Sequence, residues 1–178
     1  MRTATNRDNG MEISLVGKNF AKEAVLEVID TRRAAAREIG PDNIFHFPDG
    51  ILGFEGAKKY VLMLNEQARP FMFMQSLDTP DLSFVCIQTF MICSDFSINL
   101  PESCAKALEL ADPDDAMVVS LVTVTPEPED ITANLMSPIV INLKNMRGRQ
   151  VVVSDSIYPV RYRIWDAIMA SSVERQAI

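Results

Sequence analysis

Short apolar runs bounded by turn-forming residues are the feature that most constrains how this chain can fold. Tyr60–Leu64 and Phe71–Met74 are two such runs, and the neighbouring turns lie at Gly53–Gly56 and Asp78–Asp81. Runs of this length are too short for amphipathic helices and are typical of small antiparallel strands. The sequence therefore predicts a body built mainly from strands.

The run Met117–Thr125 gives the strongest strand signal in the chain. It reads MVVSLVTVT, carries no charge and is rich in β-branched residues. A strand this apolar needs neighbours on both edges, because an open edge would invite aggregation. Closing the sheet on itself removes such edges. We therefore predict an all-β fold, a small antiparallel β-barrel-like domain.

One short helix is expected at about 101–110. Pro101 and Glu102 favour a helix start there, and Pro113 prevents the helix from continuing. A C-terminal helix is a further expectation, since WDAIMASSVERQAI places Trp165, Ile168, Met169, Ser172 and Val173 on one face. We expect this face to dock on the barrel rather than to serve a partner. The predicted buried face of the first helix is Cys104, Ala107, Leu108 and Ala111.

The remaining elements are assigned from turn chemistry and alternation. Gly148 is expected to supply the turn of a hairpin between 139–143 and 150–153, and 131–135 reads as one helical turn. Other predicted strands lie at 24–30, 43–47, 58–64, 71–77, 82–90, 96–99 and 158–164.

The chain is predicted to have one folded domain with a tail at each end. Residues 1–23 mix polar and charged residues and are expected to form a mobile N-terminal extension. Residues 24–163 are the expected barrel domain, and 164–178 the amphipathic C-terminal tail. No apolar run reaches the ~18 residues that cross a bilayer, so no membrane partner is expected.

Charge is distributed very unevenly along the chain. Residues 1–69 carry ten acids and ten bases, residues 70–143 eleven acids and one base, and residues 144–178 three acids and six bases. The total is a net charge of −7. An acidic middle disfavours direct binding of nucleic acid, which needs bases to neutralise phosphates, and favours a basic protein partner.

The acidic residues of the middle block are the candidate partner-binding residues, chosen on charge alone. The alternative is that they lie on solvated turns and keep the protein soluble. The candidates are Asp78, Asp81, Asp95, Asp112, Asp114, Asp115, Glu127, Glu129 and Asp130.

The sequence contains no recognisable catalytic set, cofactor motif or metal-ligand pattern. His46 is the one histidine, and Cys86, Cys93 and Cys104 form no CxxC pair. With no secretory signal evident, reduced thiols in a cytoplasmic protein are expected. We therefore predict a non-enzyme with no catalytic, cofactor-binding or metal-binding residues.

Four segments resemble the FliW family in the family's order. Gly50–Glu55 reads GILGFE, like "GLPGFE", and Gln75–Leu82 reads QSLDTPDL, like "QSxDDPDL". Thr132–Asn142 is similar to "TANLxAPIVIN", and Gly148–Arg161 to "GxQVVLxxSxYxxR". The chain departs from the pattern at Leu52, Thr79 and Ser137, and the usual proline at the first of these is missing, which predicts a less rigid turn.

This resemblance implies a non-enzymatic flagellar assembly factor with a compact β-barrel-like fold. FliW-like proteins bind flagellin in the cytoplasm, a chaperone-like role, and bind the translational regulator CsrA, a basic RNA-binding protein. When free of flagellin they sequester CsrA, which then stops repressing translation of flagellin mRNA. The resemblance carries no contact residues for either partner, so the candidate residues above remain based on charge.

Two other functions are weighed against this one. The first is a small β-barrel enzyme or ligand-binding protein with a ligand in its mouth, for which a cavity with converging polar groups would be the sign. The second is direct RNA binding through the basic end, which repulsion from the acidic block disfavours. The basic residues concerned are Lys144, Arg147, Arg149, Arg161 and Arg163.

Overall fold

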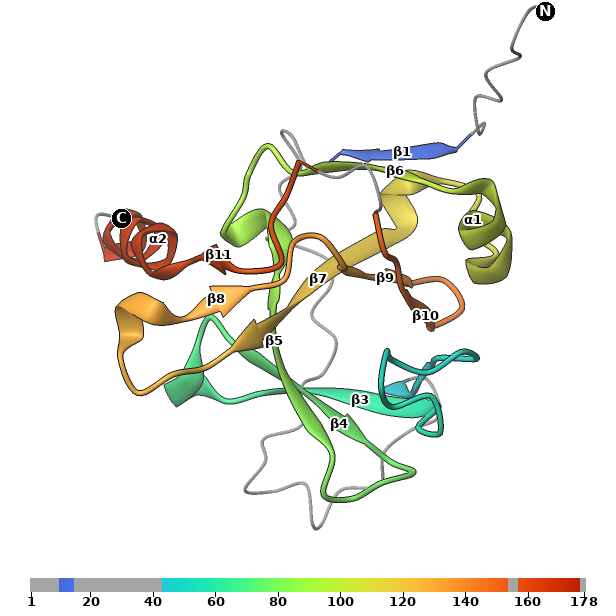
Figure 1. Ribbon diagram of the computed structural model, residues 1–178, viewed down its shortest axis with the longest axis horizontal. Coiled ribbons are helices and arrows are strands. Elements are labelled where there is room, and N and C mark those ends of the chain that lie inside the picture. The colour runs from blue at the N-terminus through green and yellow to red at the C-terminus, as the bar shows by residue number, and fades with distance from the viewer. Residues whose placement is uncertain (1–9, 15–42, 154–156, 177–178) are drawn as a thin grey trace, which may run out of the picture.

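A computed structural model describes residues 10–14, 43–153 and 157–176 of the chain (Figure 1). In the described residues strands predominate and the α-helices are short or terminal. The strands are β1 (Met11–Ser14), β2 (Phe45–His46), β3 (Lys59–Leu64), β4 (Met72–Ser76), β5 (Ser83–Gln88), β6 (Ser97–Leu100), β7 (Ala116–Thr123), β8 (Thr132–Ala133), β9 (Ile139–Asn142), β10 (Arg147–Gln150) and β11 (Tyr162–Arg163). The helices are α1 (Glu102–Leu108) and α2 (Trp165–Gln176), with 3₁₀ turns η2 (Glu66–Ala68), η3 (Thr89–Met91), η4 (Pro113–Asp115) and η5 (Pro128–Asp130).

The strands close into a barrel, as the sequence predicts. Neighbours follow the order β7, β5, β4, β3, β2, β10 and β9, and β9 pairs with β7 to complete the circle. The pairs are antiparallel except the short contact between β2 and β10, which is parallel. β8 and β11 extend from the end of β7, and β1 and β6 form a separate two-stranded sheet above the barrel in Figure 1.

β7 is the central strand, which confirms the interpretation of its sequence. Its first half pairs with β9 on one edge, and Val119–Leu121 pair with β5 on the other. Its last residues, Val122 and Thr123, pair with β8. Both faces are buried: Met117 and Val119 point into one hydrophobic cluster and Val118 into another. A continuous apolar run is the sequence expected of a strand with two buried faces.

Two large apolar clusters stabilise the fold, and a small third one surrounds Val61 and Met63. The first fills the barrel and contains fully buried aromatic residues, among them Phe45, Phe47 and Tyr60. The second lies on the other face of β7 and β9, where β1, β6, α1 and α2 pack. Ile168 of α2 is 7% exposed and belongs to this second cluster, so the start of the C-terminal helix docks on the domain. Met169, predicted on the same buried face, is instead 47% exposed.

Several predicted elements differ from the structure. Residues 131–135, predicted as a helical turn, contain β8 instead, because Thr132 and Ala133 pair with β7 and β11. Residues 11–14, placed in a mobile extension, form β1 on β6. In α1 the buried residues are Ala105 and Leu108, so of the predicted face only Leu108 is buried. The helix is shorter than predicted, because Glu109 takes the left-handed conformation, with φ 53°. The predicted strand 24–30 lies outside the described residues.

Gly148 does not supply the β9–β10 turn, which was a wrong assignment. Met146 takes the left-handed conformation there, with φ 58°, and Gly148 lies inside β10. A Cβ at position 148 would overlap the ring of Phe47, which is fully buried in the barrel. The glycine is therefore required by close packing rather than by a turn.

Gly148→Ala is expected to lower the free energy of unfolding by about 1–3 kcal/mol, the usual range for overpacking a core. Gly56→Ala is the matched control, because a Cβ there meets nothing within 4 Å. Urea denaturation followed by circular dichroism measures both. Equal stability of the two variants would contradict the packing role of Gly148.

Candidate protein-binding surface

The turn from Gly50 to Gly56 is tightly built and presents two apolar side chains. Gly50 and Gly53 have φ values of 73° and 82°, which side chains rarely adopt. Ile51 and Phe54 form an isolated bridge, and the N–H of Gly53 donates to Oε1 of Glu55 at 2.9 Å. These contacts fix the loop at the end of the barrel.

The side chains of Leu52 and Phe54 are exposed on this turn. Their exposed fractions are 58% and 45%, high for large apolar residues. Phe54 packs edge-on against Phe84 of β5, with ring centroids 5.2 Å apart. Apolar side chains held on a rigid turn are suited to contact with another protein. In the sequence this segment is recognisable only as a family motif. The sequence signal for an exposed apolar contact was the pair Leu52 and Phe54, two large apolar residues placed between the glycines of a turn.

The nine acidic candidates lie in four separate turns. Asp78 and Asp81 are in the β4–β5 turn, and Asp95 is in the loop between η3 and β6. A third turn, at η4, holds Asp112, Asp114 and Asp115, and a fourth, at η5, holds Glu127, Glu129 and Asp130. All are exposed except Asp115, which is half-buried.

The η4 and η5 turns are at opposite ends of β7. β7 is eight residues long, which at about 3.3 Å per residue separates its ends by about 26 Å. The candidates therefore form separate acidic turns rather than one patch. Contact of any of them with a partner stays a prediction.

Some candidate carboxylates already have partners within the chain. Asp115 pairs with Lys144 at 2.7 Å, and Asp130 pairs with Arg163 at 2.9 Å. Oδ1 of Asp112 accepts the backbone N–H of Asp114 at 2.9 Å. These bonds order the turns and reduce the charge that the same carboxylates offer to a partner.

Comparison with known proteins settles the family. A family model described as "FliW: FliW protein" matches residues 28–164, which is most of the chain and nearly all of the described barrel. The chain belongs to the FliW family. This confirms the resemblance carried by the four sequence segments.

Relatives and a solved structure agree with this family assignment. "Flagellar assembly factor FliW" of Desulfitobacterium hafniense (strain Y51) is 34% identical over 143 residues, covering 80% of this chain and 94% of that relative. The protein of the same name from Syntrophus aciditrophicus (strain SB) is 38% identical over 136 residues, covering 76% and 86%. "Crystal structure of the flagellar assembly factor FliW" matches with a TM-score of 0.67 at 34% identity, covering 72% of this chain and 90% of that one.

The FliW-like segments make hydrogen bonds that hold turns and loops in place. Nε2 of Gln75 donates to the carbonyls of Pro80 and Leu82, and Oγ of Ser76 accepts from the N–H of Thr79. The hydroxyl of Tyr158 accepts the N–H of Ser97. These residues of the FliW-like segments therefore help to order the turns that connect the strands.

Leu52, which replaces the proline of the family pattern, brings a hydrogen bond of its own. Its backbone N–H donates to Oε1 of Gln150 at 3.1 Å. Proline has no N–H and could not make this bond. The substitution thus ties the turn to β10, which offsets the loss of rigidity predicted from the missing proline.

The side chain of Asp78 holds the start of β3 in place. Its Oδ2 accepts the backbone N–H groups of Lys58 and Lys59 at 2.6 and 2.8 Å, where β3 begins. These two hydrogen bonds, with a smaller contribution from the Lys59 charge, hold the pKa of the Asp78 carboxyl below its usual range. Because the ionised form is favoured on folding, Asp78 stabilises the protein at pH above about 4.

Asp78→Ala is expected to cost about 1–2 kcal/mol of unfolding free energy at pH 7, similar to loss of a helix cap. Asp78→Asn is the matched control, since it keeps an oxygen acceptor and loses only the charge. The stability difference between wild type and Asp78→Asn should shrink as pH falls through the lowered folded pKa. Urea denaturation between about pH 3 and pH 7 measures this. A difference that does not change with pH would contradict the role of the carboxylate charge.

The chemistry available in the described residues is limited. Burial raises the pKa of the Cys86 thiol to about 12, and burial with the neighbouring Asp95 carboxylate raises that of Cys93 to about 11. Neither thiol is ionised at neutral pH. The described part of the chain holds no group of three or more histidine, cysteine, aspartate or glutamate side chains able to bind a metal ion. No helix within it is long and apolar enough to span a membrane.

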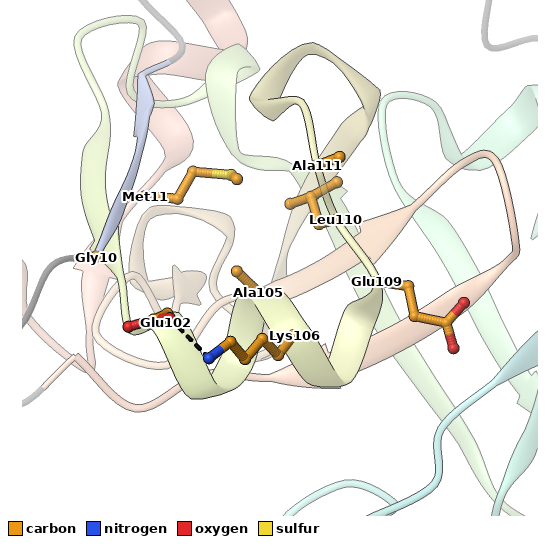
Figure 2. Close-up of a pocket in the computed structure, with 8 residues that line it drawn as sticks. All are labelled: Gly10, Met11, Glu102, Ala105, Lys106, Glu109, Leu110 and Ala111. Carbon is orange, nitrogen blue, oxygen red and sulfur yellow. Dashed lines mark ion pairs between the residues drawn. The ribbon is translucent and has the colours of Figure 1, made fainter.

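An open surface pocket of about 500 Å³ lies beside the barrel, between α1 and β1 (Figure 2). Met11 points across it from β1 towards Leu110, and Ala105 points into it from α1. Glu102 and Lys106 pair at 2.7 Å on its rim. The walls are therefore mainly apolar and the charges lie at the edge, an arrangement suited to an apolar side chain of a peptide.

Proposed function

We propose that this protein is a non-enzymatic flagellar assembly factor of the cytoplasm that binds flagellin and, when free of it, sequesters CsrA. Sequestration would relieve repression of flagellin mRNA translation. Family membership over residues 28–164 is the observation that carries this proposal. Relatives matched over most of their length are named flagellar assembly factors.

Electrostatics supports a basic partner. Residues 70–143 hold eleven acids and one base, and most of these acids lie on exposed turns. Such a surface attracts a basic protein and repels RNA. Sequestration of CsrA would then be a protein–protein contact that keeps CsrA from the mRNA, without this chain binding the mRNA itself.

The closed barrel supports a scaffold role. Its strands are paired around the circle, so the turns that carry Leu52, Phe54 and the acidic residues are fixed before any partner binds. Fixed contact groups lose little conformational entropy on association. We therefore expect flagellin or CsrA to bind without rearrangement of the barrel.

The test measures binding of the full chain to purified CsrA and flagellin by isothermal titration calorimetry. We expect both partners to bind, and the CsrA complex to weaken at least tenfold between about 50 and 500 mM salt, because exposed charges are screened. A basic protein of similar size, cytochrome c, controls for non-specific attraction. Absence of binding to either partner at low salt would contradict the proposal.

A functional readout accompanies the binding test. In a cell-free translation mixture, CsrA should repress flagellin mRNA, and this protein should restore translation when flagellin is absent. Added flagellin should reverse the restoration. If the protein has no effect on repression, the regulatory part of the proposal is wrong, even where CsrA binds.

A further inference from the structure

The side chain of Gln150, at the end of β10, joins two loops. Its Oε1 accepts the backbone N–H of Leu52 at 3.1 Å, and its Nε2 donates to the carbonyl of Ser137 at 3.2 Å. The three residues belong to three of the four FliW-like segments. One side-chain amide therefore ties together segments that lie far apart in the sequence.

The turn held by this amide, residues 51–54, is a type II β-turn. Leu52 has a negative φ and Gly53 a φ of 82°. The N–H of Phe54 donates to the carbonyl of Ile51 at 2.7 Å, which closes the turn. Proline fits the first central position of such a turn and fixes its φ. This chain has leucine there, so the hydrogen bond to the amide supplies the restraint that a proline ring would give.

Three exposed apolar side chains lie next to this bond. Leu52 and Phe54 are on the turn itself, with exposed fractions of 58% and 45%. Val152 follows Gln150 by two residues in the extended segment 151–153, so both side chains point to the same side. Val152 is 48% exposed. We call these three side chains the Leu52 surface.

The charges beside the Leu52 surface balance one another. Residues 49–59 hold two acids and two bases, and Asp49 pairs with Arg149 at 3.0 Å. Residues 70–143, by contrast, hold eleven acids and one base. A basic partner such as CsrA is therefore drawn to the acidic turns. The Leu52 surface suits a partner that is held by apolar contact instead.

We propose that the Leu52 surface is the contact for flagellin and that Gln150 is the residue that positions it. This assignment rests on the proposed function, in which CsrA and flagellin are the partners and the acidic turns suit the basic one. A turn that is already held in its binding conformation loses less conformational entropy on association. Loss of the Gln150 hydrogen bond therefore weakens flagellin binding although every apolar contact group is still present.

Isothermal titration calorimetry with the full chain and purified flagellin monomer tests the contact. The double variant Leu52→Ser and Val152→Ser should weaken flagellin binding by about tenfold or more. The loss should be the same at about 50 and 500 mM salt, because salt screens charges and not apolar contacts. Affinity for CsrA should stay within about twofold of the natural protein, since the acidic turns are unchanged.

The double variant Val124→Ser and Met169→Ser is the matched control. These side chains are exposed to nearly the same degree as the first pair, 57% and 47%, but they lie on other elements. Flagellin binding should not change in this variant. A loss equal to that of the first variant would mean that exposed apolar area in general, and not the Leu52 surface, determines binding.

Variants of Gln150 test its positioning role. Gln150→Met loses both hydrogen bonds and should weaken flagellin binding by about fivefold. Gln150→Glu keeps an acceptor for the Leu52 N–H and should restore most of the affinity. With Leu52→Pro the ring fixes the turn, so adding Gln150→Met should have no further effect. Hydrogen–deuterium exchange of the Leu52 amide needs no partner: exchange should speed up in Gln150→Met and stay slow in Gln150→Glu.

The results distinguish this assignment from the proposed function. If the natural protein binds no flagellin, the proposed function is wrong and the flagellin contact with it. If the natural protein binds flagellin and the variant Leu52→Ser with Val152→Ser binds it equally well, only the contact is overturned. If Gln150→Met has the same effect with leucine and with proline at position 52, or leaves exchange of the Leu52 amide unchanged, the positioning role of Gln150 is overturned.

Discussion

Replacing Asn142 with aspartate should lower the free energy of unfolding by about 3–5 kcal/mol at pH 7, the cost of leaving a buried charge without a partner. Asn142 is 3% exposed and lies at the end of β9. Its Nδ2 donates to the carbonyls of Leu108 and Glu109 at 3.0 and 3.1 Å, and its Oδ1 accepts the N–H of Lys144 at 2.9 Å. One side chain thus joins the end of α1 to the β9–β10 turn.

Aspartate has nearly the same shape as asparagine, but an oxygen acceptor replaces the Nδ2 donor. Its second oxygen would face two carbonyl oxygens in a buried site, and both repulsion and desolvation disfavour the ionised form. The charged neighbours are already paired, Lys144 with Asp115 and Arg147 with Glu109. These pairs would offset little of the new charge.

The destabilisation by Asn142→Asp should depend on pH in a definite direction. Its folded pKa is expected above the unfolded value of about 3.9, so the cost grows as pH rises from about 4 to 7 and falls when both states are protonated. Asn142→Leu loses the same hydrogen bonds without charge and should cost about 1–3 kcal/mol with no such pH dependence. Urea denaturation at several pH values distinguishes them. A cost that is the same at pH 4 and pH 7 would contradict the account.

The sequence predicts those elements whose signal is local. β7 is an uncharged β-branched run, and β6 alternates Ile98 and Leu100 with polar residues, so each is recognisable by itself. The β3–β4 hairpin has turn residues between two apolar runs, and Pro101 with Glu102 marks the start of α1. The barrel follows from these strands because apolar edges must be paired.

The elements that the sequence does not predict depend on distant contacts. β8 is two residues long and exists because β7 and β11 lie on either side of it. β1 pairs with a strand more than eighty residues later. Gly148 looks like a turn glycine, and only the ring of Phe47 explains it. No local pattern encodes such contacts.

For the candidate acidic residues too, the sequence predicts some features and not others. Charge along the sequence locates the acidic turns, but it does not show that Asp78 and Asp112 accept backbone N–H groups or that Asp115 pairs with Lys144. The sequence also does not show on which turn the carboxylates remain available to a partner. Side-chain geometry is needed to rank the candidates.

The η5 turn is the strongest acidic candidate on this geometry. The guanidinium of Arg163 donates to the Glu129 carbonyl at 2.9 and 3.1 Å and pairs with Asp130, which holds the turn rigid. Glu127 and Glu129 are exposed. Val124 nearby is 57% exposed, so acid and apolar surface occur together. A fixed turn with this composition suits a basic protein partner with some apolar surface.

With CsrA as the proposed partner, reversing both charges in the double variant Glu127→Lys and Glu129→Lys should slow association by about tenfold or more at low salt. Surface plasmon resonance at about 50 mM and 500 mM salt measures this, and the difference from wild type should shrink at the higher salt. The double variant Asp81→Lys and Asp114→Lys changes net charge equally at two other turns. Because steering by the whole charge distribution would slow both variants alike, a larger effect at η5 identifies that turn as a contact. Equal effects would leave only the net charge as the cause.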